Sequence, residues 1–116
     1  MINVYGIKNC DTVRKALKWL DAQGLEHTFH DVREDGLEAA KVSRWVEALG
    51  WESVLNKRST TWKQLDENKK NSLNETSSVE LMCASPTLVK RPVFEVKDLV
   101  LNGFTPAVQA RLSKKD

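Results

Sequence analysis

The chain has 116 residues, a length that predicts one domain with its own hydrophobic core. Its 18 lysines and arginines against 16 aspartates and glutamates leave a net charge of +2, too small to predict binding to nucleic acid or to an acidic membrane. The basic residues are spread along the chain, apart from Lys114 and Lys115 at its end. No apolar stretch has the length of a transmembrane helix, and the N-terminus lacks the apolar core of a signal peptide, so we expect a cytoplasmic protein.

The first third of the chain predicts a strand, a helix and a second strand. Ile2 to Gly6 form a short apolar run that is typical of a strand, and His27 to Val32 form another. A helix begins at about Asp11 and is ended by Gly24. Its apolar residues at helical spacing are Val13, Ala16, Leu17 and Leu20. A strand–helix–strand order favours a parallel pair of strands with a right-handed crossover.

The middle of the chain predicts helices, each introduced by a capping box. The first box, at residues 35–38, opens a helix that Gly50 closes. The apolar stripe of that helix consists of Val42, Trp45, Val46 and Leu49. Two further boxes lie at residues 61–64 and 77–80. The helix that contains the last box has Val79, Met82 and Cys83 on one face.

The last third of the chain predicts a hairpin followed by a helix. Pro86 suits the first position of a short helical turn. Val93 to Val96 and Leu99 to Leu101 are β-like runs joined by two residues, a spacing that predicts an antiparallel pair. The final helix is capped by residues 105–106. Its apolar residues are Val108 and Leu112.

This order of elements predicts an α/β fold, namely a thioredoxin-like mixed four-stranded sheet with flanking helices and a helical insertion. We expect a single domain of residues 1–116, whose thioredoxin-like parts cover about 1–34 and 85–113. The helical insertion between these two parts covers about 35–84.

Cys10 stands at the junction between the first strand and the first helix. A thiol at a helix N-terminus faces unpaired backbone N–H groups and the positive end of the helix dipole, and both favour the nucleophilic thiolate. The neighbouring Asp11 opposes the thiolate, whereas Lys8 and Arg14 could offset that carboxylate, so the electrostatic balance is left open. A lone cysteine is most often a buried structural residue. In this setting we interpret Cys10 as a partly exposed, reactive thiol.

A dithiol mechanism within the loop is excluded, because Val13 occupies the resolving position of a Cys-x-x-Cys motif. The other cysteine, Cys83, lies on the apolar face of its helix, and we expect a small core residue without a disulfide to Cys10. Two cysteines form neither a disulfide framework nor a zinc-ligand pattern. If Cys10 undergoes redox chemistry, we expect its resolving thiol to come from glutathione or a glutaredoxin.

Two arginines have unusual settings, although most arginines of such a protein are solvated surface charges. Arg58 directly precedes a predicted helix, where its guanidinium and the helix N–H groups could share an anion. Arg91 directly precedes Pro92 at the entrance of a strand, and this X-Pro bond is a candidate for a cis peptide. Spacing alone does not decide whether either arginine binds a ligand.

Other side chains of the sequence predict no metal or cofactor site. His27 and His30 lie on opposite faces of a short strand by parity, so they do not easily share one metal ion. No glycine-rich phosphate loop occurs. The tryptophans are expected to be core and helix-packing residues rather than a platform that stacks on bases. They are Trp19, Trp45, Trp51 and Trp62.

Four segments of the chain carry a recognisable pattern. They are Val4 to Ala16 around Cys10, Leu55 to Trp62 around Arg58, Ser85 to Pro92 with Arg91, and Asn102 to Phe104. With these segments the chain resembles the ArsC/Spx superfamily, and most closely its small YffB branch, over nearly its whole length. The first and third segments are specific when they occur together at this separation. The resemblance implies the same thioredoxin-like fold with a helical insertion.

The resemblance also implies a glutathione-dependent thiol oxidoreductase with Cys10 as nucleophile and no tightly bound cofactor. It implies that Arg58 and Arg91 bind a carboxylate of glutathione or an oxyanion, aimed toward the thiol beside a cis bond at Pro92. The residues expected to support this site are Lys8, Asn9, Arg14 and Pro92.

Two alternatives stay open. The chain is similar to glutathione-dependent arsenate reductases, in which arginines hold the oxyanion, but the further arginine that those enzymes carry is absent from Leu101 to Thr105. Spx-type members are regulators that bind RNA polymerase and commonly sense oxidation through Cys-x-x-Cys, which is missing here. We expect glutathione or a glutaredoxin as partner, with RNA polymerase under the regulatory alternative, and no direct contact with nucleic acid or a membrane.

Overall fold

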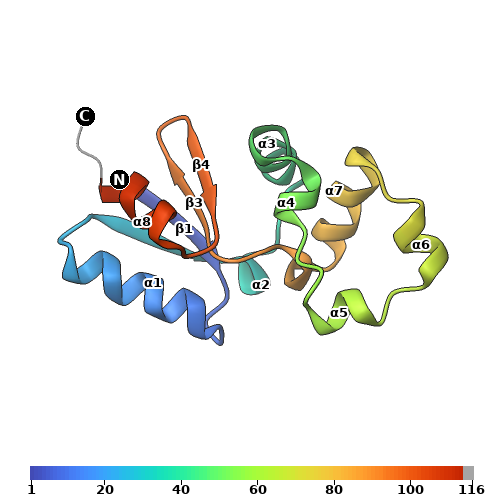
Figure 1. Ribbon diagram of the computed structural model, residues 1–116, viewed down its shortest axis with the longest axis horizontal. Coiled ribbons are helices and arrows are strands. Elements are labelled where there is room, and N and C mark those ends of the chain that lie inside the picture. Colours follow the sequence, from blue (N-terminus) through green and yellow to red (C-terminus); the bar gives the residue numbers. More distant parts are fainter. Residues whose placement is uncertain (114–116) are drawn as a thin grey trace. The chain divides into compact units, whose positions relative to one another are not determined.

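The two ends of the chain form a four-stranded sheet in the computed structural model, which describes residues 1–113 (Figure 1). The strands are β1 (Ile2–Gly6), β2 (His27–Asp31), β3 (Val93–Val96) and β4 (Leu99–Asn102), in the order β2-β1-β3-β4. β1 pairs with β2 in parallel and with β3 antiparallel, and β3 pairs with β4 antiparallel. The predicted mixed sheet, parallel first pair and hairpin are confirmed. The two lysines at 114 and 115 lie outside the described residues.

The connections of the sheet follow from its strand directions. α1 (Asp11–Ala22) joins the parallel strands β1 and β2, which need a crossover, whereas the antiparallel β3 and β4 are joined by a tight turn. β2 ends one residue earlier than expected, and β4 extends one residue further. This topology, with helices packed against the sheet, is the predicted thioredoxin-like α/β fold.

One face of the sheet packs against α1 and α8 (Pro106–Ser113). The strands contribute the alternate residues that the pleat directs to this side, and the helices contribute their apolar stripes. The buried cluster consists of Ile2, Val4, Ala16, Leu20, Phe94, Val108 and Leu112. At the start of α8, Thr105 Oγ1 accepts a hydrogen bond of 3.2 Å from the Val108 N–H, which confirms the predicted cap.

β1 approaches α1 closely at Gly6, the last residue of the strand. A Cβ at Gly6 would lie 2.7 Å from Cγ2 and 3.2 Å from Cγ1 of Val13, so a larger residue does not fit without movement. Val13, Ala16 and Leu20 are buried on the same side of the helix, as its periodicity predicts. The strand and the helix that flank Cys10 are therefore in direct contact.

The opposite face of the sheet carries polar residues that bind one another. The Tyr5 hydroxyl donates a hydrogen bond of 3.0 Å to the buried carboxylate of Glu95. The Tyr5 ring also stacks on His30, with ring centroids 4.7 Å apart. His30 Nε2 lies 3.0 Å from Asn3 Oδ1, whereas His27 Nδ1 lies 2.9 Å from a backbone carbonyl. The two histidines therefore have separate partners.

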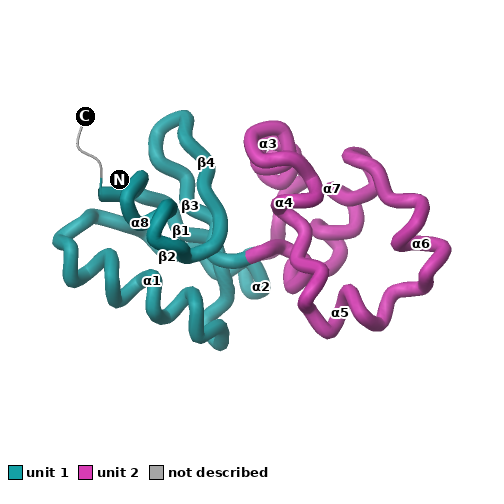
Figure 2. Tube along the Cα trace, viewed as in Figure 1, with its two compact units in different colours: residues 1–35, 91–116 teal, residues 36–90 magenta. Residues whose placement is uncertain are grey.

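A second compact unit consists of residues 36–90, whereas residues 1–35 and the residues from 91 onward form the first unit (Figure 2). The helices of the second unit are α3 (Ala39–Leu49), α4 (Trp51–Val54), α5 (Thr60–Lys63), α6 (Glu67–Asn71) and α7 (Glu75–Ala84), followed by the 3₁₀ turn Pro86–Leu88. α2 (Val32–Asp35) directly follows β2 and belongs to the first unit. That the whole chain acts as one domain stays a prediction.

Backbone hydrogen bonds tie the segment after the 3₁₀ turn to α4. The Lys90 N–H donates to the Val54 carbonyl at 2.7 Å, and the Asn56 N–H donates to the Leu88 carbonyl at 2.6 Å. Leu55 and Val89 form an antiparallel bridge between these two bonds. The second unit therefore extends past residue 84, where the sequence predicted the end of the insertion.

The three predicted capping boxes are wrong in position. The N-cap of α5 is Ser59, whose hydroxyl accepts a hydrogen bond of 3.1 Å from the Trp62 N–H. The N-cap of α7 is Asn74, which forms a capping box with Ser77 through two hydrogen bonds of 2.9 Å. At α3 the N-cap is Glu38, and its side chain makes no capping bond. Neighbouring polar residues compete for the same N–H groups, and the sequence pattern does not rank them.

The core of the second unit lies between α3 and α7. Val42, Trp45 and Val46 are buried on α3, as predicted, and α7 contributes Val79, Leu81 and Met82. Trp45 is fully buried. The other three tryptophans are half-buried residues of α1, α4 and α5, which agrees with their prediction as core and helix-packing residues. They are Trp19, Trp51 and Trp62.

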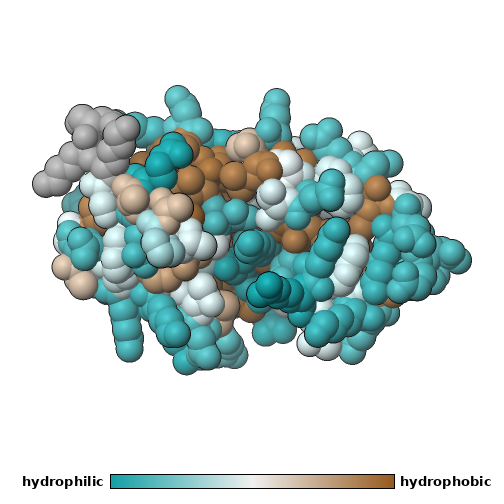
Figure 3. Space-filling model, viewed as in Figure 1, coloured by the Kyte–Doolittle hydropathy of each residue, from teal (hydrophilic) through white to brown (hydrophobic). Residues whose placement is uncertain are grey.

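The face seen in Figure 3 carries many hydrophilic side chains together with a hydrophobic area. Met1 is the large hydrophobic residue that is exposed among residues 1–113. Within the same residues no helix combines the length and the apolar composition that crossing a membrane requires.

Candidate functional site

Cys10 is the N-cap of α1, at the end of the turn that follows β1. Its backbone is extended, with φ −107° and ψ 120°, and its side chain makes no capping hydrogen bond. The Cys10 N–H donates to the Ile7 carbonyl at 3.3 Å, which closes the turn, and the Cys10 carbonyl accepts the Arg14 N–H at 3.0 Å. The thiol is free and partly exposed, which confirms the predicted exposure of Cys10.

The two cations expected beside the thiol have other partners. The Lys8 ammonium binds the Glu34 carboxylate, with Nζ–Oε distances of 3.1 and 3.2 Å, and this hydrogen bond raises the pKa of Lys8. Arg14 lies 3.5 Å from the Asp11 carboxylate, so this cation is paired with the acid beside the thiol, and its Nε also donates to the Lys8 carbonyl at 3.1 Å. The charge of Lys8 is therefore directed at α2. Asn9 is exposed in the turn.

Asp31, which the sequence analysis did not single out, is the buried acid of this region. Its carboxylate accepts hydrogen bonds from the backbone N–H groups of Lys8, Arg33 and Glu34, at 3.2, 2.9 and 3.1 Å. Burial alone would raise the pKa of Asp31, but these backbone hydrogen bonds and the nearby Lys8 charge lower it below its ordinary value. An acid at the end of a strand, followed by a helical turn, is the signal that could have identified it.

A small hollow of about 160 Å³ opens beside this acid. It is lined by Ile7, Lys8, Asn9, Asp31, Arg33 and Glu34. The turn of the thiol and the first turn of α2 thus share one polar surface.

Arg91 and Pro92 stand at the entrance of β3, the strand that pairs with β1. The Arg91–Pro92 bond is cis, as predicted. Pro92 is buried, and its carbonyl accepts the Gly103 N–H at 2.9 Å. Arg91 is half-buried as a residue, and its Nε atom is buried. The first unit therefore contains both the thiol and one of the two expected anion-binding arginines.

Arg58 belongs to the second unit and has an exposed side chain. Its N–H donates to Asn56 Oδ1 at 3.1 Å, and Ser59 caps the four-residue α5 that follows. The Ser59 hydroxyl accepts one N–H group at the start of α5, that of Trp62. That Arg58 and the remaining α5 N–H groups share an anion stays a prediction. That Arg58, Arg91 and Cys10 form one pocket stays a prediction.

Cys83 lies in α7 and is half-buried rather than a fully buried core residue, so this expectation is wrong. The buried face of α7 is instead formed by Ser78, Val79, Leu81 and Met82. Burial raises the pKa of the Cys83 thiol, which disfavours its thiolate. Both cysteines are free thiols in the structure.

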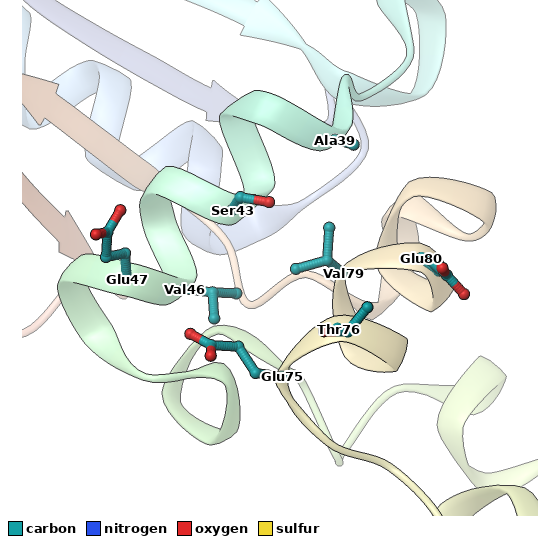
Figure 4. Close-up of a pocket in the computed structure, with 8 residues that line it drawn as sticks. All are labelled: Ala39, Ser43, Val46, Glu47, Glu75, Thr76, Val79 and Glu80. Carbon is teal, nitrogen blue, oxygen red and sulfur yellow. The ribbon is translucent and has the colours of Figure 1, made fainter.

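A larger hollow of about 450 Å³ lies between α3 and α7 (Figure 4). Val46 and Val79 face it from the two helices, and Glu47, Glu75 and Glu80 also line it. None of the site residues expected from the sequence lines this hollow. Among residues 1–113, no cluster of His, Cys, Asp and Glu side chains has the arrangement of a metal site.

Comparisons with known proteins agree with the fold and the motifs. Residues 5–111 match the model of the ArsC family. An uncharacterized protein of Haemophilus influenzae is 50% identical over 104 residues, which cover 90% of this chain and 91% of that protein. The solved structure of a YffB protein is 40% identical with a TM-score of 0.93, and the match covers 98% of this chain and 100% of the other.

Further relatives include an arsenate reductase related protein and two regulatory proteins. An arsenate reductase (ArsC) related protein of Brucella melitensis is 41% identical with a TM-score of 0.78, and the match covers 95% of this chain and 92% of that structure. The regulatory protein MgsR of Bacillus subtilis is 29% identical over 98% of this chain and 91% of its own. The global transcriptional regulator Spx of Lactiplantibacillus plantarum is 26% identical over 80% of this chain and 71% of its own. With a family match over residues 5–111 and the expected fold, this chain belongs to the ArsC family.

Proposed function

We propose that the protein is a glutathione-dependent thiol oxidoreductase in which the Cys10 sulfur is the nucleophile. The observation that supports this most directly is a free, partly exposed thiol at the N-cap of a long helix. The backbone N–H groups and the dipole of such a helix stabilise a thiolate. Membership of the ArsC family, which includes arsenate reductase-like proteins, is consistent with this role.

The proposed cycle consists of two thiol–disulfide exchanges. The Cys10 thiolate attacks the glutathione sulfur of a mixed disulfide between glutathione and a substrate, which forms a Cys10–glutathione disulfide and releases the substrate thiolate. A second glutathione thiolate attacks the glutathione sulfur of this adduct, which restores the Cys10 thiolate and releases oxidised glutathione. In the net exchange one free glutathione takes the place of the substrate thiol in the disulfide: the substrate sulfur leaves reduced, the free glutathione sulfur is oxidised as it enters oxidised glutathione, and no bound cofactor takes part.

An external thiol is required in this proposal because Val13 occupies the position of a resolving cysteine. Glutathione and glutaredoxins supply such thiols in the cytoplasm, which is where we place the protein. The half-buried Arg91 at the entrance of β3, together with the exposed Arg58, would bind a glutathione carboxylate or an oxyanion.

The test is the reaction of the purified protein with oxidised glutathione. Mass spectrometry is expected to find one glutathionyl group, and peptide mapping is expected to place it on Cys10. The Cys10→Ser variant should lose this adduct, whereas Cys83→Ser, the matched control, should keep it. An adduct of equal yield in the Cys10→Ser variant would refute the proposal.

The arginines are tested by the glutathione concentration that gives half-maximal adduct formation. Arg91→Ala and Arg58→Ala are each expected to raise it by about fivefold, the effect of losing one charge-assisted contact. Arg111→Ala, an exposed arginine of α8, is the control and should leave it unchanged. If all three variants behave alike, the arginines have no role in binding.

A regulatory role is the second candidate, because two relatives carry the names of regulators. It predicts that the purified protein retains RNA polymerase in a pull-down and that Cys10→Ser does so equally. Arsenate is the alternative substrate, and a coupled assay with arsenate and glutathione measures its reduction. We expect slow turnover at most, since residues 101–105 lack an arginine for the oxyanion.

A further inference from the structure

We propose that Asp31 is a positioning residue that holds the turn carrying Cys10 against the end of the sheet. The inference rests on the proposed function in that it takes Cys10 as the reacting thiol. Asp31 is the last residue of β2, and its register partner is Gly6, the last residue of β1. The turn of the thiol therefore begins where the carboxyl ends of two parallel strands meet.

The two oxygens of the Asp31 carboxylate bind different segments. Oδ1 accepts the N–H groups of Arg33 and Glu34, at 2.9 and 3.1 Å, and thereby caps α2. Oδ2 accepts the N–H of Lys8 at 3.2 Å, two residues before Cys10. The side chain belongs to a residue that is only 7% exposed, where water competes little for these bonds. One carboxylate thus connects α2 with the turn.

Lys8 is held at three points by residues of three elements. Its N–H binds Asp31 of β2, its ammonium binds Glu34 of α2, and its carbonyl accepts the Nε–H of Arg14 from α1. The ammonium contact is exposed and contributes little. The buried contact with Asp31 is therefore the one that anchors the turn.

The position of Cys10 at the start of α1 affects its reactivity, because Cys10 is an N-cap whose side chain makes no capping bond. Its sulfur benefits from the helix N-terminus only while the residue keeps its extended conformation, since the effect falls off within one helical turn. If the turn loosens at Lys8, the N-cap conformation varies, and the thiolate loses part of this stabilisation. We therefore expect the reactivity of Cys10 to depend on Asp31.

An asparagine at position 31 separates the two contacts of the carboxylate. Its side-chain carbonyl can still accept the N–H groups of Arg33 and Glu34, as asparagine does at N-caps. Its NH₂ group would then face the Lys8 N–H, a donor against a donor. Asp31→Asn is therefore expected to keep the cap of α2 and to release the turn.

The test measures the alkylation of Cys10 by iodoacetamide between about pH 5 and pH 9, a range that brackets the titration of most reactive thiols. The full chain with Cys83→Ser serves as background. In the Asp31→Asn variant the rate at neutral pH should fall by about tenfold, and the midpoint of the pH–rate profile should move upward. Hydrogen exchange of the Lys8 amide, measured by NMR, should become faster. Asp31→Ser, which retains a capping hydroxyl but is too short to reach Lys8, should behave in the same way.

Glu34→Gln is the matched control, because it removes the exposed ion pair with Lys8 and leaves Asp31 in place. Its rate should stay within about twofold of the background. Unchanged kinetics in both Asp31→Asn and Asp31→Ser overturn the inference, and so does unfolding of both variants. Slow alkylation of the background itself would count against the proposed function instead. In that case hydrogen exchange of the Lys8 amide still tests the role of Asp31. Faster exchange in the Asp31→Asn variant supports that role, and unchanged exchange overturns it.

Discussion

The two cysteines of this chain lie in different units and have opposite settings. Cys10 is the N-cap of the 12-residue helix α1 in the sheet unit, and it is partly exposed. Cys83 lies inside α7 in the helical unit, where burial raises the pKa of its thiol. A helix start leaves backbone N–H groups without intrahelical partners, whereas the end of a helix offers none to a thiolate. The position of a cysteine in its helix thus decides which thiol is suited to nucleophilic chemistry.

The cores of the two units provide the largest expected effects. Phe94→Ala in the sheet unit and Trp45→Ala in the helical unit each remove a fully buried ring. Each substitution is expected to lower the free energy of unfolding by about 3–5 kcal/mol in denaturant titrations. The controls are Phe29→Ala and Trp51→Ala, which truncate half-buried rings of the same type and should cost less. Equal losses in variant and control would contradict the assigned cores.

The close contact between β1 and α1 lies in the sheet unit, next to Cys10. Gly6→Ala places a methyl group 2.7 Å from Cγ2 of Val13, so it should lower the free energy of unfolding by about 2 kcal/mol. In the double variant Gly6→Ala/Val13→Ala the γ-methyl groups are gone, and the loss should be smaller than the sum of the single losses. Strict additivity in this double-mutant cycle would show that the two residues do not collide.

Alkylation compares the two thiols directly. At neutral pH Cys10 should react with iodoacetamide about tenfold faster than Cys83, because the helix start favours a thiolate and burial disfavours one. Peptide mapping after short exposure measures the ratio in the wild-type protein. The variants Cys10→Ser and Cys83→Ser give each rate by itself. A faster Cys83 would reverse the assignment of the reactive thiol.

Lowering the pH is expected to reduce the stability of the protein, because the Asp31 carboxylate near Cys10 becomes protonated. Because backbone hydrogen bonds lower the pKa of Asp31 below its unfolded value, its contribution to stability is present above that unfolded value, near pH 4, and is lost as the pH falls through the folded one. At pH 7 the Asp31→Asn variant should be less stable by about 1 kcal/mol. The difference should shrink as the pH falls below the unfolded value and through the lower folded one, because the wild type then also loses its carboxylate. A difference that does not vary with pH would contradict this account.

Most of the fold could be predicted because its signals are local. The strand at Ile2–Gly6, the helix after Cys10 and the hairpin that begins at Val93 each follow from a short run of residues with a clear period. The parallel pairing of β1 and β2 then follows from the crossover between them. The first strand and the helix that follows it flank Cys10, and the cis bond at Pro92 directly precedes the hairpin.

The N-cap residues of the helices and the degree of burial of single side chains are predicted less well by the sequence. The polar residues around Ser59 and Asn74 offer several overlapping caps, and small differences in backbone geometry select one of them. Cys83 was expected in the core because it follows Met82 on an apolar stripe, but the stripe of α7 is narrow and leaves Cys83 at its margin. How far a helix face is buried depends on its neighbours, which a periodicity does not show.

The sequence by itself determined the local chemistry of the candidate site. It placed Cys10 at a helix start, Val13 where a second thiol would stand, and Arg91 before a proline at a strand entrance. Only the tertiary structure decided that Lys8 turns to Glu34 and that Asp31 holds the backbone of Lys8. These partners are 26 and 23 positions apart in the chain. They meet because the parallel register brings the ends of β1 and β2 together, and that register depends on packing across the whole sheet rather than on any single segment.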